Sequence, residues 1–221
     1  MVDKIARTAA APSMDPTPGA RAQGWEKAET GLIGKWHRDS GAIRPLTYFR
    51  VLHDGRSLFL RYDVMDTFVK SVRTAPNSAV CNDSCVEFFV QPTPGAAYFN
   101  FEINAGGTML LYEIRDARRT ATGFADYNPV PLEWARQVEI RTSLPGKTAR
   151  PIVGPIAWTV VFRIPLALFA ARLGSCSAVK GDVWRGNFFK CGGSDHWGMW
   201  SDVGAELNFH QPAKFGELVI G

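Results

Sequence analysis

Two glutamates on consecutive predicted strands are the residues of this sequence best suited to chemistry. Glu87 lies in the segment 84–91 and Glu102 in the segment 97–104, and each is flanked by aromatic or aliphatic residues. Successive side chains of a strand point to opposite faces, so each carboxylate is expected on the face opposite its apolar neighbours. There the pair could accept hydrogen bonds from hydroxyl groups, hold a cation, or simply face water.

The same pair raises the question of catalysis, because retaining glycosidases use two carboxyl groups about 5–5.5 Å apart. No other catalytic pattern supports this reading: the sequence contains no G-x-S-x-G, HExxH or phosphate-loop motif. We therefore expect the chain to be no enzyme, and we interpret Glu87 and Glu102 as binding residues.

Further candidates for ligand contacts lie near the end of the chain. Asn187, on the predicted strand 183–191, is either a reader of hydroxyl groups or a structural residue. Trp197 and Trp200 belong to the segment 192–202, which is rich in Gly, Ser, Asp and His and has no need to bury them. An exposed indole ring can pack against the C–H face of a sugar.

The chain has four cysteines. Cys85 has the strand parity of Glu87, and Cys191 has that of Phe189, so the two sulfurs could meet in a disulfide if their strands are neighbours. The alternative is a pair of small buried thiols. The spacing of Cys81 and Cys85 is not that of a zinc knuckle, and no matching pair follows. The sequence therefore leaves metal ligands unassigned.

Short apolar runs broken by turn residues must position these side chains. Asp54-Gly55 and Gly106-Gly107 each predict a hairpin. One short helix is predicted over 165–172, with Pro165 in its first turn and Gly174 beyond its end. Many strands with one helix indicate an all-β fold, a single antiparallel β-sandwich of jelly-roll type. The predicted strands cover residues 48–52, 57–64, 84–91, 97–104, 108–114, 137–142, 157–164, 183–191 and 214–220.

Composition sets the limits of the domain and of its partners. Residues 1–20, rich in Ala, Pro, Thr and Ser, are predicted to be a flexible N-terminal segment pinned near Trp25, which leaves 21–221 as one domain. The net charge is +4 without a long basic run, so we expect no nucleic-acid partner. No apolar stretch is long enough for a membrane span. Residues 1–11 lack the apolar segment of a signal peptide, so the chain is either intracellular or separated from its leader.

Five segments, in this order, resemble carbohydrate-binding module family 9, whose characterised members are linked to xylanases. Any one of them alone is a weak signal, but together they cover nearly the whole domain. The segments are Phe49-Arg-Val-Leu-His-Asp-Gly-Arg-Ser-Leu-Phe-Leu60, Val80-Cys-Asn-Asp-Ser-Cys-Val-Glu-Phe-Phe-Val90, Tyr98-Phe-Asn-Phe-Glu-Ile-Asn104, Trp184-Arg-Gly-Asn-Phe-Phe-Lys-Cys-Gly192, and Trp200-Ser-Asp with Asn208-Phe-His-Gln-Pro-Ala-Lys-Phe-Gly-Glu-Leu-Val219.

The resemblance implies a non-catalytic module that binds a polysaccharide of the xylan or cellulose type, or its terminal sugar, in a cleft where two aromatic rings clamp the sugar. Phe209 stands at the position of one clamp ring, whereas Cys81 stands where the other is expected. Glu87 matches a family carboxylate, and Glu102 replaces a family arginine. The resemblance also implies a secreted or periplasmic location, a separate glycoside hydrolase as a neighbour, and a structural Ca²⁺ ion, although no Asp-rich loop is present.

Two other readings stay open. Sandwich domains of related fold bind haem or act in redox proteins, and here Met65, Met109 and His210 would have to supply the axial ligands. Alternatively, the loss of the clamp ring at Cys81 indicates a decayed sugar site and a scaffold role.

Overall fold

The computed structural model describes residues 4–19, 23–192 and 195–221. Strands dominate it. Their bounds are β1 Lys4–Arg7, β2 Gly31–Ile33, β3 Lys35–Trp36, β4 Leu46–His53, β5 Ser57–Val69, β6 Ser84–Gln91, β7 Tyr98–Asn104, β8 Met109–Thr120, β9 Gly123–Pro129, β10 Glu139–Thr142, β11 Ile152–Pro165, β12 Val183–Gly192, β13 Trp197–Met199 and β14 Gly216–Ile220. Four short helical segments complete the list: α1 Leu132–Ala135, α2 Leu166–Leu173, and the 3₁₀ turns η1 Val80–Asn82 and η2 Pro212–Lys214.

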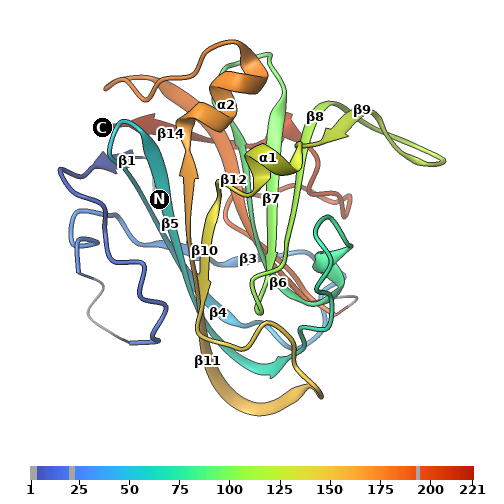
Figure 1. The fold of residues 1–221 in the computed structure, drawn as a ribbon. Coiled ribbons are helices and arrows are strands. Elements are labelled where there is room, and N and C mark those ends of the chain that lie inside the picture. Colours follow the sequence, from blue (N-terminus) through green and yellow to red (C-terminus); the bar gives the residue numbers. More distant parts are fainter. Residues whose placement is uncertain (1–3, 20–22, 193–194) are drawn as a thin grey trace.

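The strands form two layers, which Figure 1 shows side by side. One layer has the order β10-β11-β5-β4, with β2 beside β4. The other has the order β14-β12-β6-β7-β8-β9, with β13 beside β12 and β3 beside β13. Strand β1 lies between β4 and β14 and is parallel to both, so it joins the two layers at one edge. The other strand pairs in the described residues are antiparallel. The predicted all-β sandwich with a short helix is confirmed.

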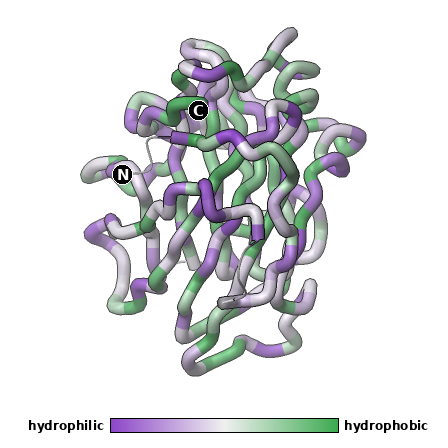
Figure 2. Tube along the Cα trace, turned by 90° about the vertical axis from the view of Figure 1, so that its left-hand side faces the viewer, coloured by the Kyte–Doolittle hydropathy of each residue, from purple (hydrophilic) through white to green (hydrophobic). Residues whose placement is uncertain are grey.

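The alternation of residue types explains why the layers pack. Hydrophobic and hydrophilic positions alternate along parts of the trace (Figure 2), and the largest apolar cluster, which includes Phe49, Phe88 and Phe188, lies between the layers. Phe49 of β4 stacks on Phe188 of β12, with ring centroids 3.8 Å apart. The hydroxyl of Tyr62 on β5 donates to the Glu87 carbonyl oxygen at 2.7 Å. These contacts across the interface fix β6 and β12 firmly against the opposite layer.

The turns occur where the sequence predicts them. Gly55, at φ +85°, closes the hairpin of β4 and β5, and Gly107, at φ +90°, closes that of β7 and β8. Such positive φ angles cost glycine little. Helix α2 matches the predicted helix to within one residue and is followed by Gly174 at φ +83°. The turn α1 and the strands β1, β2, β3, β9 and β13 were not predicted.

The N-terminal segment is more ordered than its composition indicates. Ile5 of β1 is fully buried, because β1 completes the sheet between β4 and β14. The Trp25 indole donates from Nε1 to the Ser13 carbonyl oxygen at 2.9 Å, which agrees with the expected pinning near Trp25. Of the predicted flexible segment 1–20, residues 1–3 and 20 lie outside the described residues. None of the described helices is long and apolar enough to cross a membrane.

Candidate functional site

Glu87 and Glu102 are direct partners in the antiparallel pair of β6 and β7. Their neighbours Val86, Phe88 and Phe101 point into the core, so both carboxyl groups point to the outer face of the layer, as strand parity predicts. This face is not open to bulk water. Glu87 is only 3% exposed and Glu102 only 6% exposed.

Two segments cover this outer face and leave a cavity between them. The turn η1 packs on one side, and the chain from Met199 to Phe215 packs on the other, where it forms an apolar cluster with residues such as Phe89 and Tyr98. The cavity has a volume of about 230 Å³. Its lining comprises Cys81, Asn82, Glu87, Glu102, Arg119, Cys191, Trp197, Leu207, Asn208, Phe209 and His210.

The lining includes one phenylalanine ring, Phe209, and one tryptophan ring, Trp197. Phe209 stacks on Phe189 of β12, with centroids 4.0 Å apart and an interplanar angle of 13°. One face of the Phe209 ring is therefore held by the protein, which fixes its orientation. Trp197 sits on β13 opposite Cys191. The sequence-predicted residues Glu87, Glu102, Phe209 and Trp197 thus meet at one cavity.

The two carboxyl groups differ in their hydrogen bonds. The Asn100 amide donates from Nδ2 to Oε1 of Glu102 at 2.8 Å, and the Cys191 thiol lies 3.1 Å from Oε1 of Glu87. Burial raises the pKa of Glu102 to about 7, against the hydrogen bond from Asn100 and the nearby charge of Arg119. Burial and the neighbouring Cys191 and Glu102 raise the pKa of Glu87 well above its usual range. Glu87 is therefore harder to ionise than an ordinary carboxyl group, and in its protonated form it can both donate and accept.

Arg119 and His210 are lining residues that sequence reasoning missed as ligand contacts. Arg119 extends from β8 and lies over the Phe124 ring, 4.2 Å from its centroid. His210 Nδ1 lies 2.9 Å from the Tyr98 hydroxyl oxygen. Burial lowers the pKa of His210 to about 3, and the positive charge of Arg119 acts in the same direction. For His210, the sequence signal as a sugar contact was its place next to Phe209. For Arg119 there was none, because the pairing of β8 with β9 that positions it was not predicted.

Asn187 and Trp200, both expected as ligand contacts, lie away from this cavity. The buried Asn187 side chain donates to the Ser201 carbonyl oxygen at 2.8 Å and accepts from the Ser201 amide at 2.9 Å, so it anchors the covering segment. Trp200 packs edge-on against Phe49 and Phe188, with centroids 6.2 and 5.6 Å away. It is a core residue at the rim of the sandwich, because the chain turns inward after β13.

Cys85 and Cys191 are direct partners on β6 and β12, as the disulfide hypothesis required. They are nevertheless free thiols in the structure, so the possible bond is absent and the alternative of two buried thiols applies. The Cys191 thiol is directed to the Glu87 carboxyl oxygen rather than bonded to the other sulfur.

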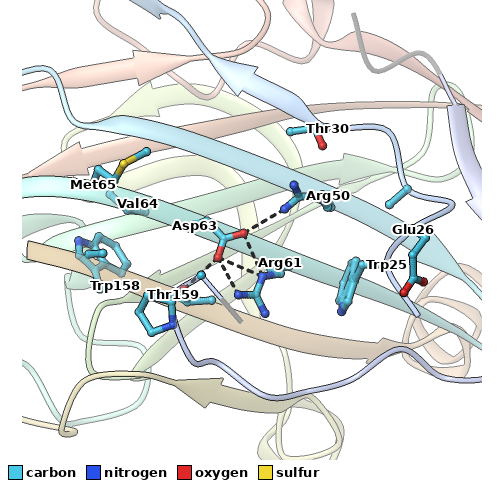
Figure 3. Close-up of a pocket in the computed structure, with 14 residues that line it drawn as sticks. Trp25, Glu26, Thr30, Arg50, Arg61, Asp63, Val64, Met65, Trp158 and Thr159 are labelled. Carbon is cyan, nitrogen blue, oxygen red and sulfur yellow. Dashed lines mark hydrogen bonds and ion pairs between the residues drawn. The ribbon is translucent and has the colours of Figure 1, made fainter. Parts of the chain in front are cut away.

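A second cavity, of about 820 Å³, lies over β4, β5 and β11 (Figure 3). The charged groups on its sheet floor pair with one another. Arg61 and Arg50 both pair with Asp63, at 2.8 and 3.1 Å. Arg61 also donates to the Asp15 and Thr17 carbonyl oxygens, at 2.8 and 3.2 Å. This arrangement holds the N-terminal segment on the sheet, so we place the candidate site in the smaller cavity.

The haem reading is not supported by the positions of its ligands. Met65 lines the cavity over β5, Met109 packs against the core from β8, and His210 lines the cavity over β6 and β7. The three side chains do not converge on one cofactor.

For the expected Ca²⁺ ion, the described residues offer one close group of three acidic, histidine or cysteine ligands, and two of its members are cysteines. Because Ca²⁺ prefers six to eight oxygen ligands, this group does not fit it, and the calcium ion stays a prediction.

A β-sandwich with a small cavity of carboxyl and aromatic groups on one outer face defines a class of sugar-binding modules. The family model for carbohydrate-binding family 9 matches residues 24–220. The chain therefore belongs to carbohydrate-binding family 9, a family of non-catalytic binding modules, and it is a carbohydrate-binding protein.

Solved structures agree with this assignment. A protein from Bacteroides uniformis, provisionally described as carbohydrate-binding, is 28% identical, with a TM-score of 0.83 over 98% of this chain and 97% of its own. Two structures of a family 9 module from Caldicellulosiruptor kristjanssonii share the fold. The complex with glucose is 16% identical, with a TM-score of 0.61 over 98% of this chain and 94% of its own. The complex with cellotriose is 15% identical, with a TM-score of 0.60 over 98% and 92%. No curated protein matches the chain.

Proposed function

We propose that the cavity lined by Glu87, Glu102 and Phe209 binds the terminal sugar of a xylan- or cellulose-type polysaccharide without cleaving it. The observation that carries this proposal is the convergence, on the outer face of one sandwich layer, of two buried carboxyl groups and a fixed aromatic ring. Sugar hydroxyl groups need hydrogen-bond partners when they leave water, and sugar C–H faces pack on aromatic rings.

The dimensions of the cavity favour a chain end. Pockets that bury drug-sized ligands measure about 300–1,000 Å³, whereas this one measures about 230 Å³. It therefore suits a single sugar ring better than several. The family's glucose and cellotriose complexes support the choice of a glucan-type ligand.

The chain would act beside a separate glycoside hydrolase, outside the cytoplasm, and keep that enzyme near its polymer. The association of the resembled modules with xylanases supports this part of the proposal. The carboxyl pair itself would bind hydroxyl groups and not perform hydrolysis.

The test is a screen of the purified chain against xylans, celluloses and their oligosaccharides, with reducing-end-blocked forms included, followed by calorimetry on the best ligand. We expect the substitution E102Q to weaken binding about tenfold or more, since a charge-assisted hydrogen bond is lost. M65A, in the larger cavity, is the matched control and should bind like the unmodified chain.

A blank across the panel, on protein whose circular dichroism shows it to be folded, would overturn the proposal in favour of the scaffold reading. Binding that M65A abolishes and E102Q leaves intact would move the site to the other cavity.

A further inference from the structure

Two of the four cysteines and one glutamate form a compact group at the floor of the candidate sugar cavity. The Sγ atoms of Cys85 and Cys191 and a carboxyl oxygen of Glu87 all lie within 4.8 Å of one another. Cys191 Sγ is 3.1 Å from Glu87 Oε1. We call these three residues the thiol–carboxyl group.

The strands hold this group rigidly. Cys85 and Glu87 are two positions apart on β6, so their side chains share a face, and Cys191 of β12 lies directly opposite Cys85. All three side chains are buried between paired central strands. Sites on strands position their ligands more accurately than sites on loops. Glu87 and Cys191 also line the cavity, which provides an entry path.

The protein's own groups leave this region short of partners. Glu102, 6% exposed and facing the same cavity, has an Oε2 atom with no hydrogen-bond partner among the described residues. The nearest buried ammonium, on Lys190, points to the other side of β12, where it bonds the Cys191 carbonyl oxygen at 2.9 Å and lies 3.6 Å from Asp66. Buried, unpartnered carboxyl oxygens are uncommon in native proteins, and a water ligand on a cation held by the thiol–carboxyl group would be able to donate to this oxygen.

We propose that Cys85, Cys191 and Glu87 bind a thiophilic divalent cation of the Zn²⁺ type, with the fourth coordination position open to the cavity. Two sulfur ligands and one oxygen ligand suit tetrahedral Zn²⁺, whereas Ca²⁺ and Mg²⁺ prefer oxygen ligands alone. From Zn–S and Zn–O bond lengths, ligand atoms of such a site lie roughly 3.3–3.8 Å apart, so small side-chain rotations close the observed group around an ion.

The two thiols and the Glu87 carboxyl group release their protons to solvent when the ion binds. The dication with three anionic ligands has a net charge of −1. The Lys190 ammonium, on the other side of β12 and shared with Asp66, offsets part of this charge. The metal site shares Glu87 with the proposed sugar cavity, but its three ligands need no sugar to bind the ion.

The experiment uses the full chain, reduced with a phosphine and stripped of metal with EDTA, and titrated with Co²⁺ as a spectroscopic probe. We expect one equivalent to produce the thiolate-to-cobalt charge-transfer band and the intense visible bands of tetrahedral Co²⁺, and Zn²⁺ to abolish both. Proton release into weakly buffered solution should accompany binding. Zn²⁺, but not Mg²⁺ or Ca²⁺, should raise the melting temperature with concentration.

C85S and C191S should each weaken Zn²⁺ binding at least a hundredfold, and E87Q about tenfold or more. C176S is the matched control, because Cys176 lies beyond α2 beside a different surface pocket, and it should leave the spectrum unchanged. An octahedral Co²⁺ spectrum without a charge-transfer band in the unmodified chain would overturn the proposal, whether or not the serine variants fold. So would an unchanged spectrum in folded C191S.

Discussion

Glu87 and Glu102 face each other across β6 and β7, and both carboxyl groups are buried on the outer face of their layer. Two carboxyl groups in this position repel each other when ionised. Burial and the neighbouring groups favour the protonated form of Glu87, and Glu102 accepts a hydrogen bond from Asn100. The pair thereby offers both a donor and an acceptor to whatever enters the cavity.

The aromatic ring of Phe209 is expected to contribute directly to sugar affinity. Because Phe189 fixes this ring, F209A should remove a stacking surface worth about 1 kcal/mol, which weakens binding about tenfold or less by that contact alone. Calorimetry with the preferred oligosaccharide measures it. F209W, which restores a larger ring, should bind at least as tightly as the unmodified chain. Unchanged affinity in F209A would exclude the ring from the site.

Asn187 is expected to affect stability and not recognition. N187A breaks two hydrogen bonds to Ser201 and leaves buried groups unsatisfied, so the free energy of unfolding should fall by about 1–3 kcal/mol. Urea denaturation measures this loss. Sugar affinity at a temperature where the variant is folded should remain within about twofold. A large loss of affinity with normal stability would instead support a direct contact.

The half-buried His210 should make the domain sensitive to acid. Its folded-state pKa of about 3 lies below the unfolded-state value near 6.5, so the unfolded chain takes up a proton first as the pH falls. Tyr98 bonds the ring and Arg119 acts on it by its charge, and Cys81, Glu87 and Glu102 line the same cavity. Stability from this residue is complete above pH 6.5 and is lost between about pH 6.5 and 3, at no more than about 1.4 kcal/mol per pH unit.

Denaturant titrations from pH 7 to pH 4 test this expectation, with H210Q as the comparison. Glutamine has a neutral side chain at every pH in this range, so its stability should fall less steeply with acidification. Parallel curves for the two proteins would show that His210 does not take part.

Arg61 is expected to hold the N-terminal segment on the sheet. It is 2% exposed and bonds the Asp15 and Thr17 carbonyl oxygens, so R61M should free this segment while Arg50 still pairs with Asp63. Limited proteolysis should then cut between residues 8 and 18 severalfold faster. R163M, on the neighbouring strand and without such bonds to the segment, serves as the control.

Sequence patterns predicted the layers of this fold better than the segments that cover them. The strand 84–91 was predicted to the residue, because its apolar alternation and its flanking turns are both strong. Strand β1 was missed because its four residues gain stability from partners more than 45 positions away, β4 and β14. No local pattern carries that information.

The same distinction applies to the site. Parity alone placed Glu87 and Glu102 on one face, and the family resemblance supplied Phe209. Trp200 and Asn187 lie away from the cavity because the path of the covering segment 199–215 is set by tertiary contacts, such as those of Ser201 and Phe188. A tryptophan in a polar loop and a tryptophan in a core rim have the same local sequence.

Strand β1 lies beside β14, and the Gly221 amide bonds the Ile5 carbonyl oxygen at 3.0 Å, so the two ends of the fold meet (Figure 1). During synthesis, residues 4–7 must therefore wait for residues 216–220 before the edge between the layers can close. A ribosome-bound chain lacking β14 exposes β1 and the flank of β12 as unpaired edges, which are templates for aggregation. A circularly permuted chain with a short linker joining these ends, and new termini in an exposed turn, would be able to form that edge early.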